Sequence, residues 1–475
     1  YGQGDIATIT LRVSTDYTGN ASTATWTNLP IHSGKIGNSN SNDNEYVKGI
    51  VDLTAYGNGP NGNTVTLALR YQGSSSAYSD SNRNGTFWFS DLQFIAQSNK
   101  ITNTWTGLEN SDFRSPKNWD TKAAPVLTTN NLVIPAGLTN YPTVTSALTI
   151  NSLIIESAAS FIAQSSVTGN VTYKRKIPFS SGNSEGWHLV GSPVNGQIYN
   201  DAFVADNSIE ISGNSRAIAT YNNNVSTNNW NYFQSGGNGT FGNATGYSIK
   251  TSEDKNISFS GTMNTNDVTK AVTVGTGNAY NLISNPFTAY MNSGTFLNLA
   301  SNSSKLSSKT IWVWNSSTKN YDAKIASEAF KLAPAQAFFV SCSANGNLTF
   351  EKKIQSHQTT DTFLKTTLKP EIILNITDGN LVRYAKIYYD DNATKGFDNG
   401  LDGASFNGVT NKLDVFTHLL TKSEGKNYQI QSLPNQNLES MIIPIGVKSE
   451  VGKEIIFSAD VLNLPDNMNV FLEDR

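Results

Sequence analysis

The sequence predicts an all-β protein, a string of β-sandwich or jelly-roll domains and short β-repeat domains that ends in an immunoglobulin-like sandwich. Three observations lead to this prediction. Hydrophobic residues at the 3.6-residue spacing of an amphipathic helix are rare, whereas short alternating runs such as TVTLALRY and EIILNI recur. Clusters of Asn, Gly, Ser and Asp separate these runs, as expected for turns between strands. A chain of 475 residues is also too long for one core.

The composition excludes several classes of protein. Only 15% of the residues are charged and the net charge is -3, so the chain lacks the basic face with which proteins bind nucleic acids. The single cysteine, Cys342, excludes an internal disulfide framework and a multi-cysteine metal site. Its place in the apolar run AFFVSCS favours a packed side chain over a nucleophile. No apolar run approaches the roughly 18 residues that span a bilayer.

The first predicted domain, residues 1–97, begins directly on an alternating strand, so we interpret the chain as a fragment or processed form. It contains STDYTG at Ser14–Gly19, VDL at Val51–Leu53 and a closing WFSDL strand at Trp88–Leu92. In these phrases it resembles the second half of the jelly-roll domain of secreted Bacteroidota proteins, the cleaved-adhesin or choice-of-anchor type. The family's opening strands are missing.

The resemblance also implies a candidate metal site. Some jelly rolls bind Ca²⁺ through a carboxylate on the closing strand, which makes Asp91 a candidate ligand, together with Asp16 or Asp52. The alternative is a carboxylate that caps a turn or lies at a sheet edge. No dense DxDxDG loop is present to favour the metal.

The second predicted domain, residues 98–176, resembles the W-x-G…NW…P…VxIP module of surface proteins of the same phylum. The matching positions are Trp105, Gly107, Asn118, Trp119, Pro125, Ile134 and Pro135. Short strand rungs separated by turn residues predict a small β-helical or sandwich stack with the tryptophans packed at one end. Exposed aromatic rings can instead stack on sugars, so Trp88, Trp105 and Trp119 are candidate carbohydrate-binding residues.

The middle of the chain is an internal duplication. The phrase GWHLVGSP at Gly186–Pro193 returns as AYNLISNP at Ala279–Pro286, and aromatic residues recur in the same order 91 to 93 residues apart. The pairs are Trp187 with Tyr280, Tyr221 with Trp314, Trp230 with Tyr321, Tyr247 with Phe338, and Phe259 with Phe350. We therefore predict two β-repeat domains, residues 177–266 (copy 1) and 267–356 (copy 2).

The substitutions between the two copies are of the kind that packed residues tolerate and that catalytic residues would not. Trp, Tyr and Phe replace one another at matching positions, and His188 of copy 1 is Asn281 in copy 2. The tandem resembles the GW-x-L-(I/V)-(G/S)-(N/S)-P region near the carboxyl end of many type IX-secreted Bacteroidota proteins. We interpret the repeated phrase as a feature of the fold.

A polar linker, residues 357–369, precedes the last domain, residues 370–475, in which about seven alternating strands predict the immunoglobulin-like sandwich. This domain resembles the one that precedes, or belongs to, the sorting region of type IX cargo. The matching phrases lie at Tyr388–Gly403, Ile442–Gly446 and Val470–Arg475. Relatives usually continue past LED into further strands that carry the export signal, so no residue here can be assigned to recognition by the secretion machinery.

An acidic loop in this domain is a second candidate Ca²⁺ site. Asp390, Asp391, Asp398 and Asp402 lie within 13 residues, and such carboxylates repel one another unless a cation or hydrogen bonds offset their charges. Their spacing differs from that of an EF-hand. The neighbouring Asn and Gly residues are equally typical of a hairpin with Asx turns.

No catalytic motif is present. The sequence contains no GxSxG, HExxH or P-loop, and it has four scattered histidines. We expect a non-catalytic accessory and display region of a type IX-secreted protein at the outer face of the outer membrane. Its expected partners are the translocon, an outer-membrane barrel and shuttle proteins. The alternatives are a carbohydrate-binding adhesin of surface glycans and the accessory region of a secreted hydrolase or nuclease.

Overall fold

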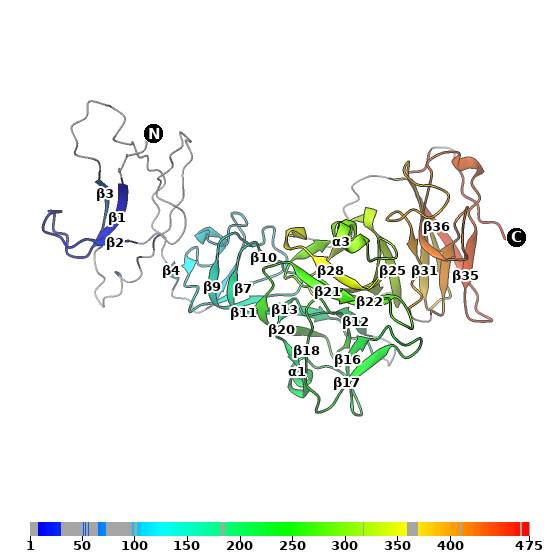
Figure 1. Cartoon of the computed structure of the whole chain (residues 1–475), viewed down its shortest axis with the longest axis horizontal. Coiled ribbons are helices and arrows are strands. Elements are labelled where there is room, and N and C mark those ends of the chain that lie inside the picture. Colours follow the sequence, from blue (N-terminus) through cyan, green and yellow to red (C-terminus); the bar gives the residue numbers. More distant parts are fainter. Residues whose placement is uncertain are drawn as a thin grey trace. The chain divides into compact units, whose positions relative to one another are not determined.

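The protein is all-β, as the sequence predicts (Figure 1). The helices of the described residues, α1 (Asp201–Asp206), α2 (Ser293–Asn298) and α3 (Ala300–Ser303), are short, and none is long and apolar enough to cross a bilayer. The chain divides into two compact units, residues 1–94 and residues 95–475. The computed structural model describes residues 8–29, 51, 53, 56, 65–72, 97–98, 102–181, 186–316, 318–358, 369–408, 411–465 and 468–474.

In the first unit, β1 (Thr8–Ser14) lies between β2 (Thr27–Asn28) and β3 (Thr66–Gln72) in an antiparallel sheet. The turn after β1 is held by Asp16, whose Oδ1 accepts hydrogen bonds from the Ser14 hydroxyl (2.6 Å) and the Thr25 amide (2.8 Å). These bonds lower the pKa of the Asp16 carboxyl. Asp16 therefore acts as a turn cap in this structure.

The W-x-G module (residues 98–176) is a stack of parallel strands. Its strands β5 (Thr102–Thr104), β7 (Asn131–Ile134), β9 (Leu148–Ile155) and β11 (Val167–Ile177) each pair in parallel with the next. Alternate residues of β7 and β9 are buried, because successive side chains of a strand point to opposite faces. The remaining elements are η2 (Pro116–Asn118) and the parallel pairs β4 (Gln97–Ser98) with β6 (Ala124–Pro125) and β8 (Thr143–Val144) with β10 (Ile162–Ala163).

The two copies have the same sheet. In copy 1 the strand order is β12-β19-β16-β15 with β17 also paired to β16, and in copy 2 it is β22-β27-β24-β25. Strands β12, β19, β16 and β17 therefore correspond to β22, β27, β24 and β25, and among the described strands β15 is an addition of copy 1. The strands of copy 1 are β12 (Trp187–Val190), β13 (Val194–Asn195), β14 (Ile198–Tyr199), β15 (Ile211–Ser212), β16 (Ser215–Tyr221), β17 (Trp230–Gln234), β18 (Gly239–Thr240), β19 (Tyr247–Lys250) and β20 (Lys255–Met263). Those of copy 2 are β21 (Val268–Val272), β22 (Tyr280–Ser284), β23 (Tyr290–Asn292), β24 (Thr310–Asn315), β25 (Asn320–Ile325), β26 (Lys331–Leu332), β27 (Ala337–Ser341), β28 (Gly346–Phe350) and β29 (Gln355–Ser356).

The duplication includes one strand before residue 177. Tyr173 of β11 pairs with Phe259 of β20, as Val268 of β21 pairs with Phe350 of β28. Strand β11 therefore belongs both to the parallel stack and to copy 1, and one six-stranded sheet, β13-β20-β11-β9-β7-β5, joins the two. The 3-10 helices η3 (Ala326–Glu328) and η4 (Lys352–Ile354) lie in copy 2.

Each copy also has a matching short helix. The Asn200 side chain caps α1 by accepting a hydrogen bond from the amide of Phe203 (2.9 Å), and Asn292 caps α2 through the amide of Thr295 (3.2 Å). Phe203 of α1 contacts Phe259, and Phe296 of α2 contacts Phe350. The same aromatic pair thus packs each helix against an equivalent strand of its copy, β20 or β28.

The described part of the terminal domain (residues 370–475) forms seven strands, hydrogen-bonded into one sheet, where the sequence predicts about seven. Its order is β35-β33-β34-β31-β30-β36, with β32 paired to β34. Alternate residues of β30 and β31 are buried on the apolar face. The strands are β30 (Glu371–Thr377), β31 (Val382–Tyr389), β32 (Gly403–Ala404), β33 (Asp414–Thr417), β34 (Tyr428–Leu433), β35 (Ile445–Lys448) and β36 (Ile456–Leu462), and η5 (Leu438–Ser440) precedes β35.

Candidate functional site

The candidate sugar-binding tryptophans of the W-x-G module are interior residues. Trp105 is 0% and Trp119 1% exposed, and their rings meet edge to face at 5.4 Å. Each indole N–H donates to a backbone carbonyl, Trp105 to Asn140 (2.9 Å) and Trp119 to Phe113 (3.1 Å). Stacking on a sugar needs an exposed ring face, and neither ring offers one. Trp105 and Trp119 are therefore packed residues, which is the first of the two alternatives that the sequence leaves open. Trp88, Asp52 and Asp91 lie outside the described residues.

The other residues of the W-x-G…NW motif also have structural roles. Gly107 has a φ of +60°, and a Cβ there would lie 2.1 Å from the carbonyl oxygen of Asn140, so only glycine fits. Asn118 is fully buried, and its Oδ1 accepts hydrogen bonds from the amides of Glu109 (2.9 Å) and Asn110 (3.1 Å). The motif therefore specifies a loop conformation.

The repeated phrase shapes a turn in both copies. The Ser192 hydroxyl accepts from the amide of Val194 (3.3 Å), and the equivalent Asn285 accepts from the amide of Phe287 (3.0 Å). Both side chains are buried, 1% and 0% exposed. His188 and its counterpart Asn281 likewise bond to backbone: His188 Nε2 donates to the Pro178 carbonyl (3.1 Å), and Asn281 Nδ2 donates to that of Thr273 (2.7 Å). These hydrogen bonds of the phrase therefore hold the backbone of both copies.

The aromatic pairs of the duplication pack against one another. Tyr247, Phe259, Phe338 and Phe350 are buried in the cores of the two copies. The hairpins place Tyr221 opposite Trp230 and Trp314 opposite Tyr321, with ring centroids 5.3 and 5.0 Å apart. Such contacts stabilise the hairpins beyond the area they bury.

The acidic loop of the terminal domain does not bring its four candidate carboxylates together at one point. Asp390 accepts hydrogen bonds from the amide (2.9 Å) and side chain (3.1 Å) of Asn392 and pairs with Lys369. Burial opposes the charge of Asp390, but these partners lower its pKa overall. Asp391 is exposed. Within the described ranges, no group of three or more His, Cys, Asp or Glu side chains is placed to hold a metal.

Asp398 and Asp402 share one turn of that loop. The Thr394 hydroxyl donates to Asp398 (3.0 Å), and the backbone amide of Asp398 donates to Oδ2 of Asp402 (2.6 Å). Asp402 is fully buried, and its Oδ1 accepts from the amide of Ser432 (2.7 Å). Burial is the main cause that raises the pKa of Asp402 to about 7. These contacts match the Asx-turn alternative that the sequence leaves open.

The same loop binds copy 2, and we call this contact the junction. It comprises residues 390–408, Arg383 and Gln429 of the terminal domain against Lys309, β22, β24, β25, β27 and η3 of copy 2. Several hydrogen bonds from copy 2 hold the loop, among them Lys309 N to Asn399 Oδ1 (2.7 Å), Ser327 N to Gly400 O (3.2 Å), the Thr310 hydroxyl to Asp402 O (3.3 Å) and Trp312 Nε1 to Ala404 O (2.8 Å). The backbone amide of Ala323 also donates to Oε1 of Gln429 (2.8 Å).

A buried ion-pair network crosses the junction. Arg383 is 1% exposed and lies 3.1 Å from Asp414 of its own domain and 3.6 Å from Asp322 of copy 2. Its guanidinium also donates to the carbonyl of Tyr321 (3.4 Å). Removing one member of such a network leaves a charge buried without its partner, which typically costs about 3–5 kcal/mol.

An aromatic cluster completes the junction. Phe406 of the terminal domain is 1% exposed and inserts among rings of copy 2. Its centroid lies 4.3 Å from that of Tyr321, 4.6 Å from Tyr280 and 4.9 Å from Phe339. The Tyr280 hydroxyl meanwhile contacts Asn407 (2.5 Å). Two of the aromatic positions of the duplication therefore serve the contact with the terminal domain.

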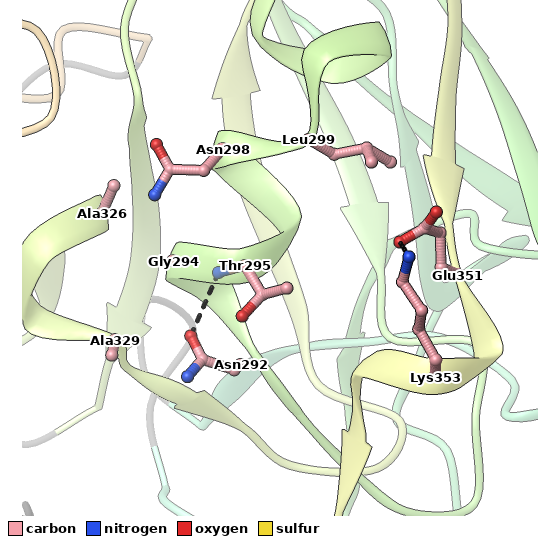
Figure 2. A pocket seen from close by; sticks show the side chains of 9 residues that line it. All are labelled: Asn292, Gly294, Thr295, Asn298, Leu299, Ala326, Ala329, Glu351 and Lys353. Carbon is pink, nitrogen blue, oxygen red and sulfur yellow. Dashed lines mark hydrogen bonds and ion pairs between the residues drawn. The ribbon is translucent and has the colours of Figure 1, made fainter.

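An open surface hollow of about 530 Å³ lies on copy 2 (Figure 2). Figure 2 shows Glu351 and Lys353 on one side, paired with each other (3.1 Å), and Ala326 and Ala329 on the other. Between them, the Asn292 side chain caps α2 by accepting a hydrogen bond from the amide of Thr295. The charged groups of the hollow neutralise each other, so they do not converge on a ligand position.

A smaller pocket, about 120 Å³, lies between the copies. It is lined by Tyr221 and Thr245 of copy 1 and by Lys270, Tyr280 and Asn281 of copy 2, among others. Lys270 donates to the Thr245 hydroxyl (2.8 Å), and burial lowers the pKa of its ammonium group. The pocket has room for a few water molecules and is smaller than typical ligand pockets of about 300–1,000 Å³.

His357 fixes the end of copy 2 to the W-x-G module. Its Nε2 lies 2.9 Å from the Thr143 hydroxyl and its Nδ1 2.9 Å from that of Ser160. Burial lowers the pKa of His357 to about 4, so the ring is neutral near pH 7. Since both ring nitrogens are occupied and Ser160 is fully buried, the group serves a structural role.

Sequence reasoning missed Arg383 and His357. A signal for Arg383 exists, because Ala385, Ile387 and Tyr389 of β31 alternate on the buried face and Arg383 has the same phase. A charged residue in that phase indicates a buried ion pair. Nothing in the sequence marks His357, whose partners lie about 200 residues earlier.

Comparison with known proteins places the chain in a family. A family model described as "Domain of unknown function (DUF8693)" matches residues 149–475, from β9 through both copies to the end of the terminal domain. No curated protein and no solved structure matches the chain. The chain belongs to the DUF8693 family.

Proposed function

We propose that this chain is the non-catalytic accessory and display region of a type IX-exported surface protein. The terminal domain engages the export and attachment apparatus of the outer membrane, and the two copies and the W-x-G module hold the rest of the protein at the outer face. This role rests on the resemblance of the terminal domain to type IX cargo and on the contacts that this domain makes.

The junction is the observation that carries the proposal. One of the three phrases that carry the resemblance, Tyr388–Gly403, is the segment whose Asn399 and Gly400 accept hydrogen bonds from copy 2. Arg383 beside it forms a buried network with Asp322 of copy 2. A force applied to the terminal domain is therefore transmitted to copy 2 through the junction, which includes the buried pair of Arg383 and Asp322. A display module requires such a connection.

Export in a Bacteroidota strain with a type IX system tests the proposal. The gene that encodes this chain is expressed with residues 370–475 deleted or, as the control, with residues 8–97 deleted. Surface labelling with antibody and co-purification with an outer-membrane barrel are measured. We expect the first deletion to abolish both signals and the second to preserve them. Unchanged surface labelling after deletion of residues 370–475 contradicts the proposal.

Glycan binding is the outcome that would favour the adhesin alternative. The intact chain is applied to a glycan array, and the Trp88→Ala variant is compared with it. Binding that this substitution abolishes in a folded protein would replace the display role with carbohydrate recognition. We expect no glycan signal that depends on Trp88.

A further inference from the structure

Strand β36 is an unprotected edge of the terminal sheet. Among the described strands it is hydrogen-bonded to β30 alone, without a register shift, and every one of its residues is exposed. It contains no proline, lysine or arginine, the residues with which proteins usually protect a sheet edge. The opposite edge strand, β35, is shorter and ends at Lys448. Of the two edges that the described strands of this sheet form, β36 therefore offers the longer regular row of backbone groups to another strand.

The apolar face of the sheet continues onto β36 without a cover. The register pairs Phe457 with Ile376, Ala459 with Leu374, and Val461 with Ile372. The three β30 residues are at most 7% exposed, whereas Phe457 is 40% and Val461 44% exposed. On the other face of the strand, Ile456 and Leu462 are 59% and 36% exposed. An additional strand beside β36 would bury apolar side chains on both faces.

The sequence of β36 is symmetric in chemical character about Ala459. It reads IFSADVL, with two apolar residues at each end and Ser458 and Asp460 on either side of the alanine. In an antiparallel pair of two such strands centred on Ala459, Phe457 faces Val461, Ile456 faces Leu462 and Ser458 faces Asp460. We propose that β36 pairs in this way with β36 of a second copy of this chain, around a two-fold axis at Ala459.

Other registers are worse for physical reasons. A shift by one residue places the apolar face of one strand against the opposite face of the other. A shift by two residues in one direction brings Asp460 opposite Asp460, and like charges directly opposite each other are destabilising. The same shift in the other direction brings Asp460 opposite Ile456. The register centred on Ala459 is the one that avoids all three conflicts.

Cysteine cross-linking of the full chain tests the register. The native Cys342 is 1% exposed, so an introduced cysteine is the accessible thiol under native conditions. We expect Ala459→Cys to form a covalent dimer under mild oxidation, because the two residues meet at the axis. The matched control, Ser458→Cys, should form little, because the two Ser458 positions are diagonal neighbours, too far apart for the roughly 4 Å Cβ separation of a disulfide. Equal cross-linking of both variants would overturn the register.

Charge substitutions test the contact without a cross-link. Sedimentation equilibrium of the native chain should show a concentration-dependent dimer. Ala459→Lys places two ammonium groups opposite each other and should weaken the dimer at least 10-fold, whereas Ser458→Lys meets Asp460 of the second copy and should keep or tighten it. Circular dichroism checks that both variants fold. A native chain that stays monomeric up to its solubility limit, or two lysine variants with the same effect, would refute the proposal.

Discussion

The two copies share a fold and differ in what covers them. Strand β17 of copy 1 is mostly exposed, whereas the equivalent β25 of copy 2 is buried at every residue. One position that contributes to this difference is Ala219 of copy 1, which corresponds to Trp312 of copy 2. The larger ring reaches the carbonyl of Ala404 and contacts Phe406 of the terminal domain.

The comparison separates two kinds of residue in a duplicated protein. Positions that build the sheet and its turns keep their chemistry in both copies, as Phe259 and Phe350 or Ser192 and Asn285 do. Positions on the outer face have diverged, and in copy 2 they form the junction. The duplication therefore supplied two similar bodies, of which one was adapted to hold the terminal domain.

The largest effect is expected for substitutions in the core that the two copies share. Phe259→Ala and Phe350→Ala each remove a fully buried ring from the same place in the two copies, so each should cost about 3–5 kcal/mol of unfolding free energy. Urea denaturation followed by tryptophan fluorescence measures both losses. A large loss in one copy and none in the other would contradict the structural equivalence.

The second prediction tests the divergent part. Arg383→Met should lower the free energy of unfolding by about 3 kcal/mol, because it leaves Asp322 and Asp414 buried without their cation. The control is Arg216→Met in copy 1, where the partner Asp201 is 47% exposed and the loss should be about 1 kcal/mol or less. Urea denaturation of both variants gives the difference. Equal losses would show that the junction contributes no more than a surface ion pair.

The third prediction uses pH to test the contact between His357, which follows copy 2, and the W-x-G module. The pKa of His357 is about 4 in the folded chain, below the ordinary 6.5, so protonation favours the unfolded chain. The stability that this group contributes is present above pH 6.5 and is lost as the pH falls toward 4. The loss at pH 5 is up to about 2 kcal/mol. Urea denaturation at pH 7.5 and pH 5 measures how much unfolding free energy is lost between the two pH values. We expect His357→Gln to lose less than the native chain. An equal loss in both proteins would exclude this role for His357.

Much of the repeat fold could be predicted from the sequence, because aromatic residues at a constant spacing mark equivalent strands. The aromatic pairs locate β16 and β17 in copy 1, β24 and β25 in copy 2, and the equivalent strands β20 and β28. Strand β11 escaped prediction as part of copy 1, because Tyr173 and its counterpart Val268 are not an aromatic pair. Helices α1 and α2 span six residues each, too few to show a helical period.

The junction could be predicted only in part. The sequence identified the acidic loop as unusual, since four carboxylates lie close together, but its partners come from copy 2, about 90 residues earlier. A contact between distant segments leaves no local pattern. The tryptophans of the W-x-G module were ambiguous for a related reason, because an indole that packs and one that stacks on a sugar are the same residue in the sequence.

Hydrogen exchange of the intact chain tests the central claim, that copy 1 and copy 2 have the same fold and that the junction covers copy 2 alone. Strands β17 and β25 occupy equivalent edges, but β25 is covered, and its Ala323 amide donates to Gln429. The amides of β25 should exchange at least about 10-fold more slowly than those of β17, and Arg383→Met should narrow the difference by accelerating β25 alone. Equal exchange rates in the native chain would contradict the account.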